Sequence, residues 1–272
     1  MRSRPSNSVS GSETVTRLIT AAVPPMIAVA HGSRDPRSAR VVSAAVAAIR
    51  ARRPELDVRL CFLDLNAPSV DQVVDAVAAE GHSTAVAVPL LLGSAFHARV
   101  DLPGILAAAR ARHPQLTVLQ SGVLGHDRRL IDAVRDRITT AGATADDADT
   151  GVVLAAVGSS HTAANDDTRR LAAVLAEGTR WAGAVTCFAT SAEPTVGQAI
   201  SLLRSRGVER IVIAPWFLAP GRLTDRLGAA ALAAAPEVLF ADTIGAHPHL
   251  ADVALDRYEA ALAVDARIER SA

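Results

Sequence analysis

The chain has 272 residues, of which 50% are hydrophobic and 21% are charged. This composition is typical of an ordinary globular protein with one or two domains. Arginine plus lysine and aspartate plus glutamate each total 28, so the formal net charge is zero. The chain therefore has no net electrostatic field that would attract nucleic acid or a membrane surface. An anionic ligand must be bound by arginines that lie at its own site.

The termini and the cysteines favour a cytoplasmic protein. The first residues, 1–23, are rich in Ser, Thr and Arg, and the apolar stretch that follows Leu18 ends at Pro24-Pro25. We interpret them as a disordered tail rather than a signal peptide. No window reaches about 18 uninterrupted apolar residues, so no membrane span is expected. Cys61 and Cys187 are too few for a disulfide framework or a cysteine-rich zinc site.

An internal repeat dominates the sequence. Gly32-Ser33 recurs at Gly158-Ser159, an offset of 126 residues (158 minus 32). Three other anchors recur at the same offset: Cys61-Phe62 at Cys187-Phe188, Pro68 at Pro194, and Pro89 at Pro215. One constant offset over about 60 residues indicates a duplication. We therefore predict two duplicated domains, 24–142 and 151–265, with a linker at 143–150 and tails at 1–23 and 266–272.

Each half alternates short aliphatic runs with longer segments of helical period, which is the pattern of a parallel sheet with crossover helices. The runs predicted as strands are Met26–Ala30, Val58–Leu63, Thr84–Leu91 and Leu116–Leu119, then Val152–Val157, Ala184–Phe188, Arg210–Ala214 and Val238–Ala241. The helices predicted in the first half are Arg37–Arg52, Ser69–Ala79, Leu102–Arg112 and Asp127–Thr140. The expected architecture is α/β, with two four-stranded parallel sheets flanked by helices.

Three potential metal ligands follow strands of the first half. His31 comes directly after the first strand, Asp64 after the second, and His97 lies in the loop after the third. In parallel sheets ligands bind outside the carboxyl ends of the strands, where these loops converge. Two imidazoles and a carboxylate suit a divalent ion such as iron, cobalt, nickel or zinc, and a neutral imidazole can also accept a proton near pH 7. The alternative is that each side chain only satisfies a hydrogen bond.

The second half provides an internal control. The repeat partners of these three residues are Val157, Thr190 and Leu223. Since the duplicate builds its fold without these residues, their presence in the first half favours a functional role over a structural one. Sequence drift in the second half is the competing explanation. His161 and Glu193 lie near the equivalent edge and could form an altered second site. The other histidines are expected on the surface, away from this edge: His82, His113, His126, His247 and His249.

Three motifs in order resemble the sirohydrochlorin chelatases of the CbiX type. They are His31-Gly32-Ser33-Arg34, Phe62-Leu63-Asp64 before Pro68-Ser69, and Pro89-Leu90-Leu91-Leu92-Gly93 leading to His97 and Asp101-Leu102-Pro103. Both halves take part, since Pro215-Trp216-Phe217-Leu218, Gly221 and Asp225-Arg226 look like the corresponding stretch of two-domain members. One departure is Asp64, because the family usually carries glutamate there.

The resemblance implies a chelatase-like fold and insertion of Fe(II) or Co(II) into sirohydrochlorin, with metal binding by His31, Asp64 and His97. We expect the two histidines to be catalytic, holding the ion and accepting protons. The substrate carries eight carboxylates, so Ser33, Arg34 and Arg99 become candidate substrate contacts. No nucleotide-binding loop follows a strand, so we expect no ATP requirement. We also expect no permanently bound cofactor, no nucleic-acid or membrane partner, and a monomer.

Two other functions remain compatible with the sequence. A non-catalytic metal or tetrapyrrole carrier would need the same open histidine site and would saturate at one equivalent of cargo. A duplicated α/β interaction protein would show no metal affinity.

Overall fold

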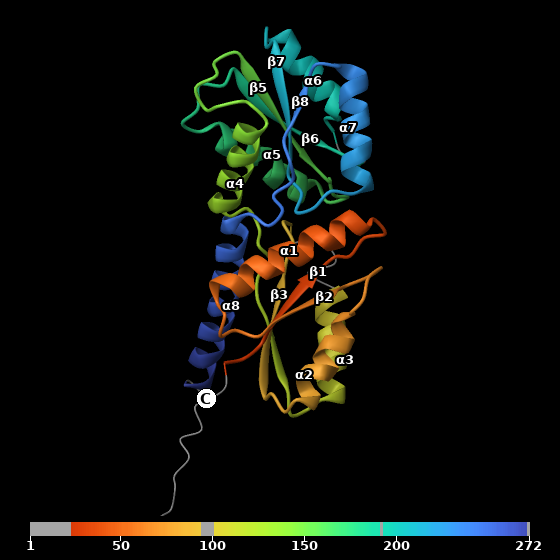
Figure 1. Ribbon diagram of the computed structural model, residues 1–272, viewed down its shortest axis with the longest axis vertical. Coiled ribbons are helices and arrows are strands. Elements are labelled where there is room, and N and C mark those ends of the chain that lie inside the picture. Colours follow the sequence, from red (N-terminus) through yellow and green to blue (C-terminus); the bar gives the residue numbers. More distant parts are fainter. Residues whose placement is uncertain (1–22, 94–100, 191–192, 271–272) are drawn as a thin grey trace, which may run out of the picture.

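The computed structural model describes residues 23–93, 101–190 and 193–270. They form two parallel four-stranded sheets with the same strand order, β2-β1-β3-β4 and β6-β5-β7-β8 (Figure 1). The strands are β1 Met26–Ala30, β2 Val58–Phe62, β3 Thr84–Pro89, β4 Thr117–Gln120, β5 Thr150–Ala156, β6 Gly183–Phe188, β7 Arg210–Pro215 and β8 Leu239–Phe240. The helices are α1 Pro36–Arg52, α2 Val70–Ala79, α3 Leu102–Arg112, α4 Arg128–Thr140, α5 Thr162–Ala176, α6 Val196–Ser205, α7 Arg222–Ala234 and α8 Pro248–Glu269. The predicted fold class is confirmed, and β1 and α3 have the predicted bounds.

The duplication extends to local backbone geometry. The peptide bonds before Pro68 and Pro194 are both cis. Directly after each proline, a capping box starts a helix: Ser69 with Gln72 begins α2, and Thr195 with Gln198 begins α6. In such a box the hydroxyl accepts from one backbone N–H, and the glutamine reaches back to another, so two unpaired donors of the first turn are satisfied. The repeat therefore conserves helix starts as well as strands.

The last helix of each repeat packs against the other half. Helix α4 belongs to the first repeat but packs against α5 and β7, and α8 belongs to the second repeat but packs against α1, α4, β3 and β4. In Figure 1, α4 lies beside α5, whereas α8 runs along the half that contains α1 and β3. The ranges 24–142 and 151–265 thus mark repeats along the chain, and in space the two halves are interlocked.

The exchange joins the apolar interior of the two halves. One buried cluster covers the sheet faces under α1, α8, α4 and α5, and includes Val86, Leu130, Val212 and Tyr258. Helices α2 with α3, and α6 with α7, cover the opposite faces with two smaller clusters. Burial of apolar surface is the main stabilising term in folding, so a shared cluster couples the stability of both halves.

The ends of the expected units differ slightly from the elements observed. Strand β5 starts at Thr150, the last residue of the expected linker, and α8 continues through Glu269 into the expected tail. Helix α8 starts at Pro248, within the sequence His247-Pro248-His249. The N-terminal tail lies outside the described residues except for Val23. Within the described ranges, no helix has the length and apolar character needed to cross a bilayer.

Candidate active site

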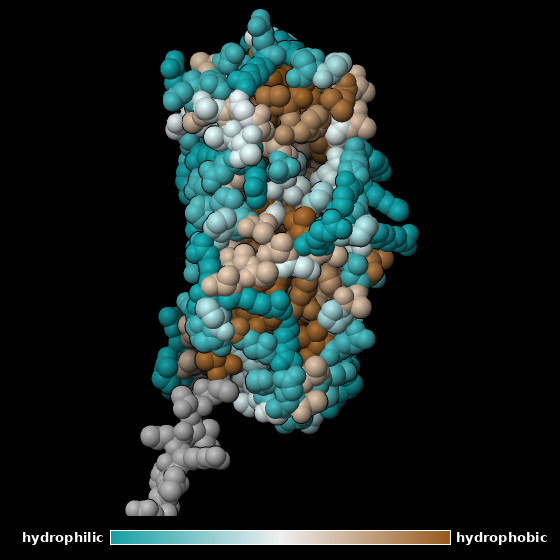
Figure 2. Space-filling view, in the orientation of Figure 1, coloured by the Kyte–Doolittle hydropathy of each residue, from teal (hydrophilic) through white to brown (hydrophobic). Residues whose placement is uncertain are grey.

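A cavity of about 750 Å³ lies between the two halves. The carboxyl ends of strands from both sheets open into it, so the two ligand-binding edges face each other. On the face drawn in Figure 2, tan and brown apolar atoms run through the middle of the molecule between areas of teal. The second half therefore forms the opposite wall of the cavity.

His31 lines this cavity directly after β1. Its Nδ1 lies 3.3 Å from the Gly32 carbonyl oxygen. A proton on Nδ1 would donate to that carbonyl, and the Nε2 atom then carries the lone pair that a metal ion or a proton takes. His31 is exposed, as a residue that receives an ion from solvent must be.

Gly32 is required by the contact between the first two loops. Its φ is +98°, and a Cβ built on it would lie 1.8 Å from the backbone oxygen of Asp64. Only glycine accommodates both the left-handed backbone and this approach. The backbone N–H of Asp64 also donates to the His31 carbonyl at 3.0 Å. The loop after β1 is thus held against the loop after β2.

Asp64 follows β2 as predicted and is exposed, but it is not among the described residues that line the cavity. Its Oδ1 accepts a hydrogen bond of 2.7 Å from the Leu65 backbone N–H, and Leu65 has a φ of +65°. The structure therefore brings Asp64 to the His31 loop through the backbone, and its carboxylate stabilises its own turn.

The remaining predicted residues divide into three groups. Ser33 lines the cavity, and Asn66 Oδ1 accepts a hydrogen bond of 2.6 Å from its backbone N–H. Arg34 is exposed and is absent from the described lining. His97 and Arg99 lie outside the described residues.

The second half contributes apolar and aromatic groups to the cavity. Val157 and Leu223, the repeat partners of His31 and His97, both line it. Trp216, directly after β7, also lines it and is 5% exposed. His161, considered above for a second site, is instead the N-cap residue of α5 and is absent from the described lining. Both walls of the cavity therefore combine apolar and polar groups: His31 and Ser33 in the first half, and Asn165, Asp167 and Thr168 in the second, lie among apolar neighbours.

His126 and Arg222 are cavity residues that sequence reasoning missed. His126 follows β4 and lines the cavity, so the expectation that it lies away from this edge is wrong. Its ring lies 6.2 Å from that of Trp216, centroid to centroid, and burial lowers the pKa of His126. Arg222 is the first residue of α7 and also lines the cavity. The rule that located His31 applies to both, because each follows the carboxyl end of a strand.

Charged side chains join the two halves beside the cavity. Arg37, in the first turn of α1, pairs with Asp35 at 2.6 Å and with Asp225 of α7 at 2.5 Å. The guanidinium of Arg37 lowers the pKa of Asp35 to about 2. The ion pair with Asp225 holds the start of α7 near the loop that carries His31.

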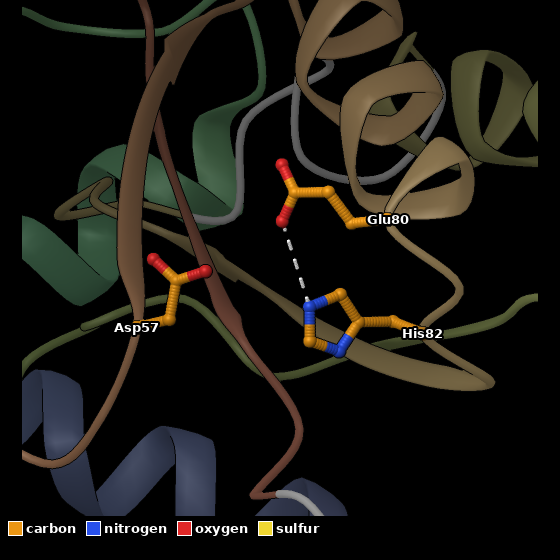
Figure 3. Close-up of side chains that lie close together, drawn as sticks. All are labelled: Asp57, Glu80 and His82. Atoms are coloured by element: carbon orange, nitrogen blue, oxygen red, sulfur yellow. Dashed lines mark ion pairs between the residues drawn. The ribbon is translucent and has the colours of Figure 1, made fainter.

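Another group of potential ligands lies at the opposite edge of the first sheet. Among the described residues, the ligand atoms of Asp57, Glu80 and His82 lie within 4.8 Å of one another (Figure 3). Arg59 bonds both carboxylates, at 2.8 Å to Asp57 Oδ2 and 2.8 Å to Glu80 Oε1. We interpret this group as an ion-pair cluster, because a guanidinium already neutralises the carboxylates. It precedes β2 and β3, away from the ligand-binding edge.

Two halves that face each other across a ligand cavity, with histidine at a strand end, define a duplicated α/β protein of the chelatase type. The CbiX family matches residues 25–141 and 151–261. The chain belongs to the CbiX family.

Individual relatives agree with this assignment. A sirohydrochlorin ferrochelatase from Priestia megaterium is 30% identical over 202 residues, which cover 73% of this chain and 74% of the relative. The structure of SirB from Bacillus subtilis with Fe³⁺ superposes with a TM-score of 0.74 at 26% identity, covering 86% of this chain and 93% of SirB. The sirohydrochlorin chelatase SirB from Bacillus subtilis subspecies spizizenii, in complex with cobalt, gives a TM-score of 0.72 at 25% identity, covering 87% and 94%.

Proposed function

We propose that this chain is a sirohydrochlorin chelatase that inserts Fe(II) or Co(II) into sirohydrochlorin. The observation that carries the proposal is the placement of His31 in a cavity between two halves of a CbiX-family fold. The volume of about 750 Å³ lies in the upper part of the range for small-molecule sites, which suits a large ligand. The metal is a substrate and does not remain with the protein.

Metallation exchanges two pyrrole protons for one divalent ion, so the site must present a metal on one face of the ring and accept protons. In the proposal His31 and His97 hold the ion, and Asp64 orients or completes the set. The contact of His31 Nδ1 with the Gly32 carbonyl supports a tautomer that ligates through Nε2. As ring nitrogens replace the protein ligands, an imidazole or the carboxylate takes up a proton. Few ligands are an advantage, because a closed four-ligand site would retain the ion.

The substrate is proposed to lie with one face toward His31 and the other toward the second half, where apolar side chains form part of the cavity wall. Trp216 and Val157 supply part of that wall. Ser33 is proposed as a polar contact, and Arg34 and Arg99 stay predictions for binding of the peripheral carboxylates. Catalysis would then be confined to the first half, and the second half would shape the cavity.

We further infer a monomer that works in the reducing cytoplasm without ATP. The two halves of one chain supply both walls of the cavity, which supports a monomer. Cys61 and Cys187 are both free thiols, and burial raises the pKa of each to about 12. Protonated, buried thiols are poor metal ligands, which leaves the chemistry to oxygen and nitrogen donors.

The test is anaerobic metallation of sirohydrochlorin with Fe(II) or Co(II), followed by absorbance. Wild-type protein should accelerate the reaction over the spontaneous rate through many turnovers, whereas a carrier would stop at one equivalent. His31→Ala should abolish most of the acceleration with an unchanged circular dichroism spectrum. His161→Ala is the matched control, because it removes an imidazole from the second half at a residue absent from the described lining of the cavity. Absence of acceleration by the wild type, or full activity of His31→Ala, would overturn the proposal.

A further inference from the structure

The ligand of the proposed function poses an electrostatic problem for the cavity. Its eight carboxylates need cationic partners, yet the whole chain is formally neutral and arginine supplies its positive side chains. Arg222 is the arginine that the cavity lining contains within the described ranges. It belongs to the second half, which has no counterparts of the predicted metal ligands.

The position of Arg222 brings the two halves together near the His31 loop. A Cβ built on the preceding residue, Gly221, would lie 3.9 Å from Ser33 Oγ, across the boundary between the halves. One helical turn further on, Asp225 pairs with Arg37. The start of α7 therefore lies beside the loop after β1, and Arg222 lines the cavity there.

Two charged groups at or beside the cavity, Arg37 and Asp167, are already paired, whereas Arg222 keeps its charge for a ligand. Arg37 is engaged by Asp35 and Asp225, and Asp167, which lines the cavity, pairs with Arg170. Arg222 has no side-chain ion pair or hydrogen bond within the described part of the chain, and its charge contributes weakly to the lowered pKa of Asp35. An unpaired guanidinium at a cavity wall can form two parallel hydrogen bonds with one carboxylate.

The start of α7 strengthens the same preference. The helix has 13 residues, and its first N–H groups and dipole favour negative charge near Arg222. At this end, Thr224 Oγ1 accepts a hydrogen bond of 2.8 Å from the Gly221 N–H, which fixes the turn. The Arg222 guanidinium and the N-terminus of α7 thus both favour a negatively charged group in the same part of the cavity.

We propose that Arg222 is a specificity-determining residue that binds a peripheral carboxylate of the tetrapyrrole, an acetate or propionate group, from the second half. The proposal rests on the proposed function and deepens it. The second half then recognises the rim of the macrocycle, while the first half handles the metal at the centre. This contact orients the ring and takes no part in proton transfer.

The experiment compares Arg222→Gln with Arg226→Gln, which removes the same charge from the same helix one turn away, outside the described lining of the cavity. Loss of one charge-assisted contact at a partly solvated site should raise KM for sirohydrochlorin by about tenfold. The kcat value should stay within about twofold, since the contact is equal in ground and transition states. Arg226→Gln should change KM by less than about twofold. Arg222→Lys should give an intermediate KM, because lysine keeps the charge but cannot form the two parallel hydrogen bonds of a guanidinium.

A binding measurement separates this proposal from the proposed function. Fluorescence quenching with a metal-free porphyrin octacarboxylate reports binding without turnover, and a porphyrin dicarboxylate serves as the comparison. Arg222→Gln should weaken binding of the octacarboxylate by about tenfold and that of the dicarboxylate much less. If wild type binds the octacarboxylate but metallates nothing, only the proposed function fails. If Arg222→Gln and Arg226→Gln bind and turn over like wild type, the role of Arg222 is refuted, and a matching effect of Arg34→Gln would place the carboxylate contact on the first half instead.

Discussion

Gly32→Ala tests whether the contact between the first two loops builds the site. The new Cβ would lie 1.8 Å from the Asp64 backbone oxygen, in a residue whose φ is +98°. A carbonyl oxygen in the main chain cannot turn aside as a side chain can, so the two loops must separate. Because the substituted residue sits between His31 and Ser33, this movement should displace the histidine from the cavity.

The repeat provides a matched control in Gly158→Ala. Gly158 has a φ of +90°, and its added Cβ would meet Thr190 Oγ1 at 2.7 Å and Phe188 Cβ at 3.3 Å. Both substitutions share the left-handed backbone cost of about 1–2 kcal/mol. At Gly158 the nearest atom belongs to a side chain that can rotate, so the total loss in free energy of unfolding should stay at about 2 kcal/mol. At Gly32 the backbone clash should bring the total to about 4 kcal/mol, within the range of severe steric changes.

Urea unfolding and metallation assays check this reasoning together. Gly32→Ala should lose about 2 kcal/mol more than Gly158→Ala and should lose most chelatase activity, while Gly158→Ala keeps it. Adding Thr190→Ala to Gly158→Ala should recover part of the loss by removing the hydroxyl, at the expense of its 2.7 Å bond to the Val157 carbonyl. Equal free energies of unfolding for the two glycine variants would refute the backbone-clash argument. Full activity of Gly32→Ala would show that the loop contact does not position His31.

Three further predictions concern the fold. Ser69→Ala and Thr195→Ala each remove a capping hydroxyl and should each cost about 1 kcal/mol in urea unfolding; a difference above about 1 kcal/mol would contradict equivalent roles in the two repeats. A chain ending at residue 247 lacks α8 and should expose the sheet face beneath it, giving strong binding of an apolar dye; weak binding would contradict the helix exchange. Burial lowers the pKa of His126, so its unfolded form takes up a proton first and stability should fall as pH drops below about 6.5. His126→Gln should make the fall in melting temperature between about pH 7.5 and about pH 5.5 shallower, and an unchanged slope would exclude a contribution from this imidazole.

The secondary structure could be predicted because each element carries its own pattern. The five-residue run Met26–Ala30 is apolar throughout, as a strand covered on both faces must be, and it is β1. The helix starts were visible in the proline and cap residues, as at Ser69. What the pattern could not reveal is which sheet a helix covers. Helices α4 and α8 each follow the last strand of a repeat, and nothing in their apolar faces distinguishes the near sheet from the far one.

The site was only partly predictable for a related reason. His31 and Ser33 were located by the strand-end rule, which needs no knowledge of the other half. Arg222 and Trp216 became cavity residues only because the two halves face each other, and a single-half argument cannot supply that orientation. His126 obeyed the rule but was placed away from this edge, because it stands directly before the predicted helix Asp127–Thr140. Applied to every strand of both repeats, the rule would have marked all three as strand-end residues, but not that the two edges share one cavity.

The interlocked helices also fix when the protein can become complete during synthesis. The sheet of the first half emerges from the ribosome early, but the helix that covers one of its faces, α8, is translated only after the strands of the second repeat. Domains commonly fold from the N-terminus as they emerge. Here the first half must wait with an apolar face uncovered until α8 has been made. A nascent chain that stalls within the second repeat would therefore carry an unfinished His31 cavity, and metal handling can begin only once α8 is in place.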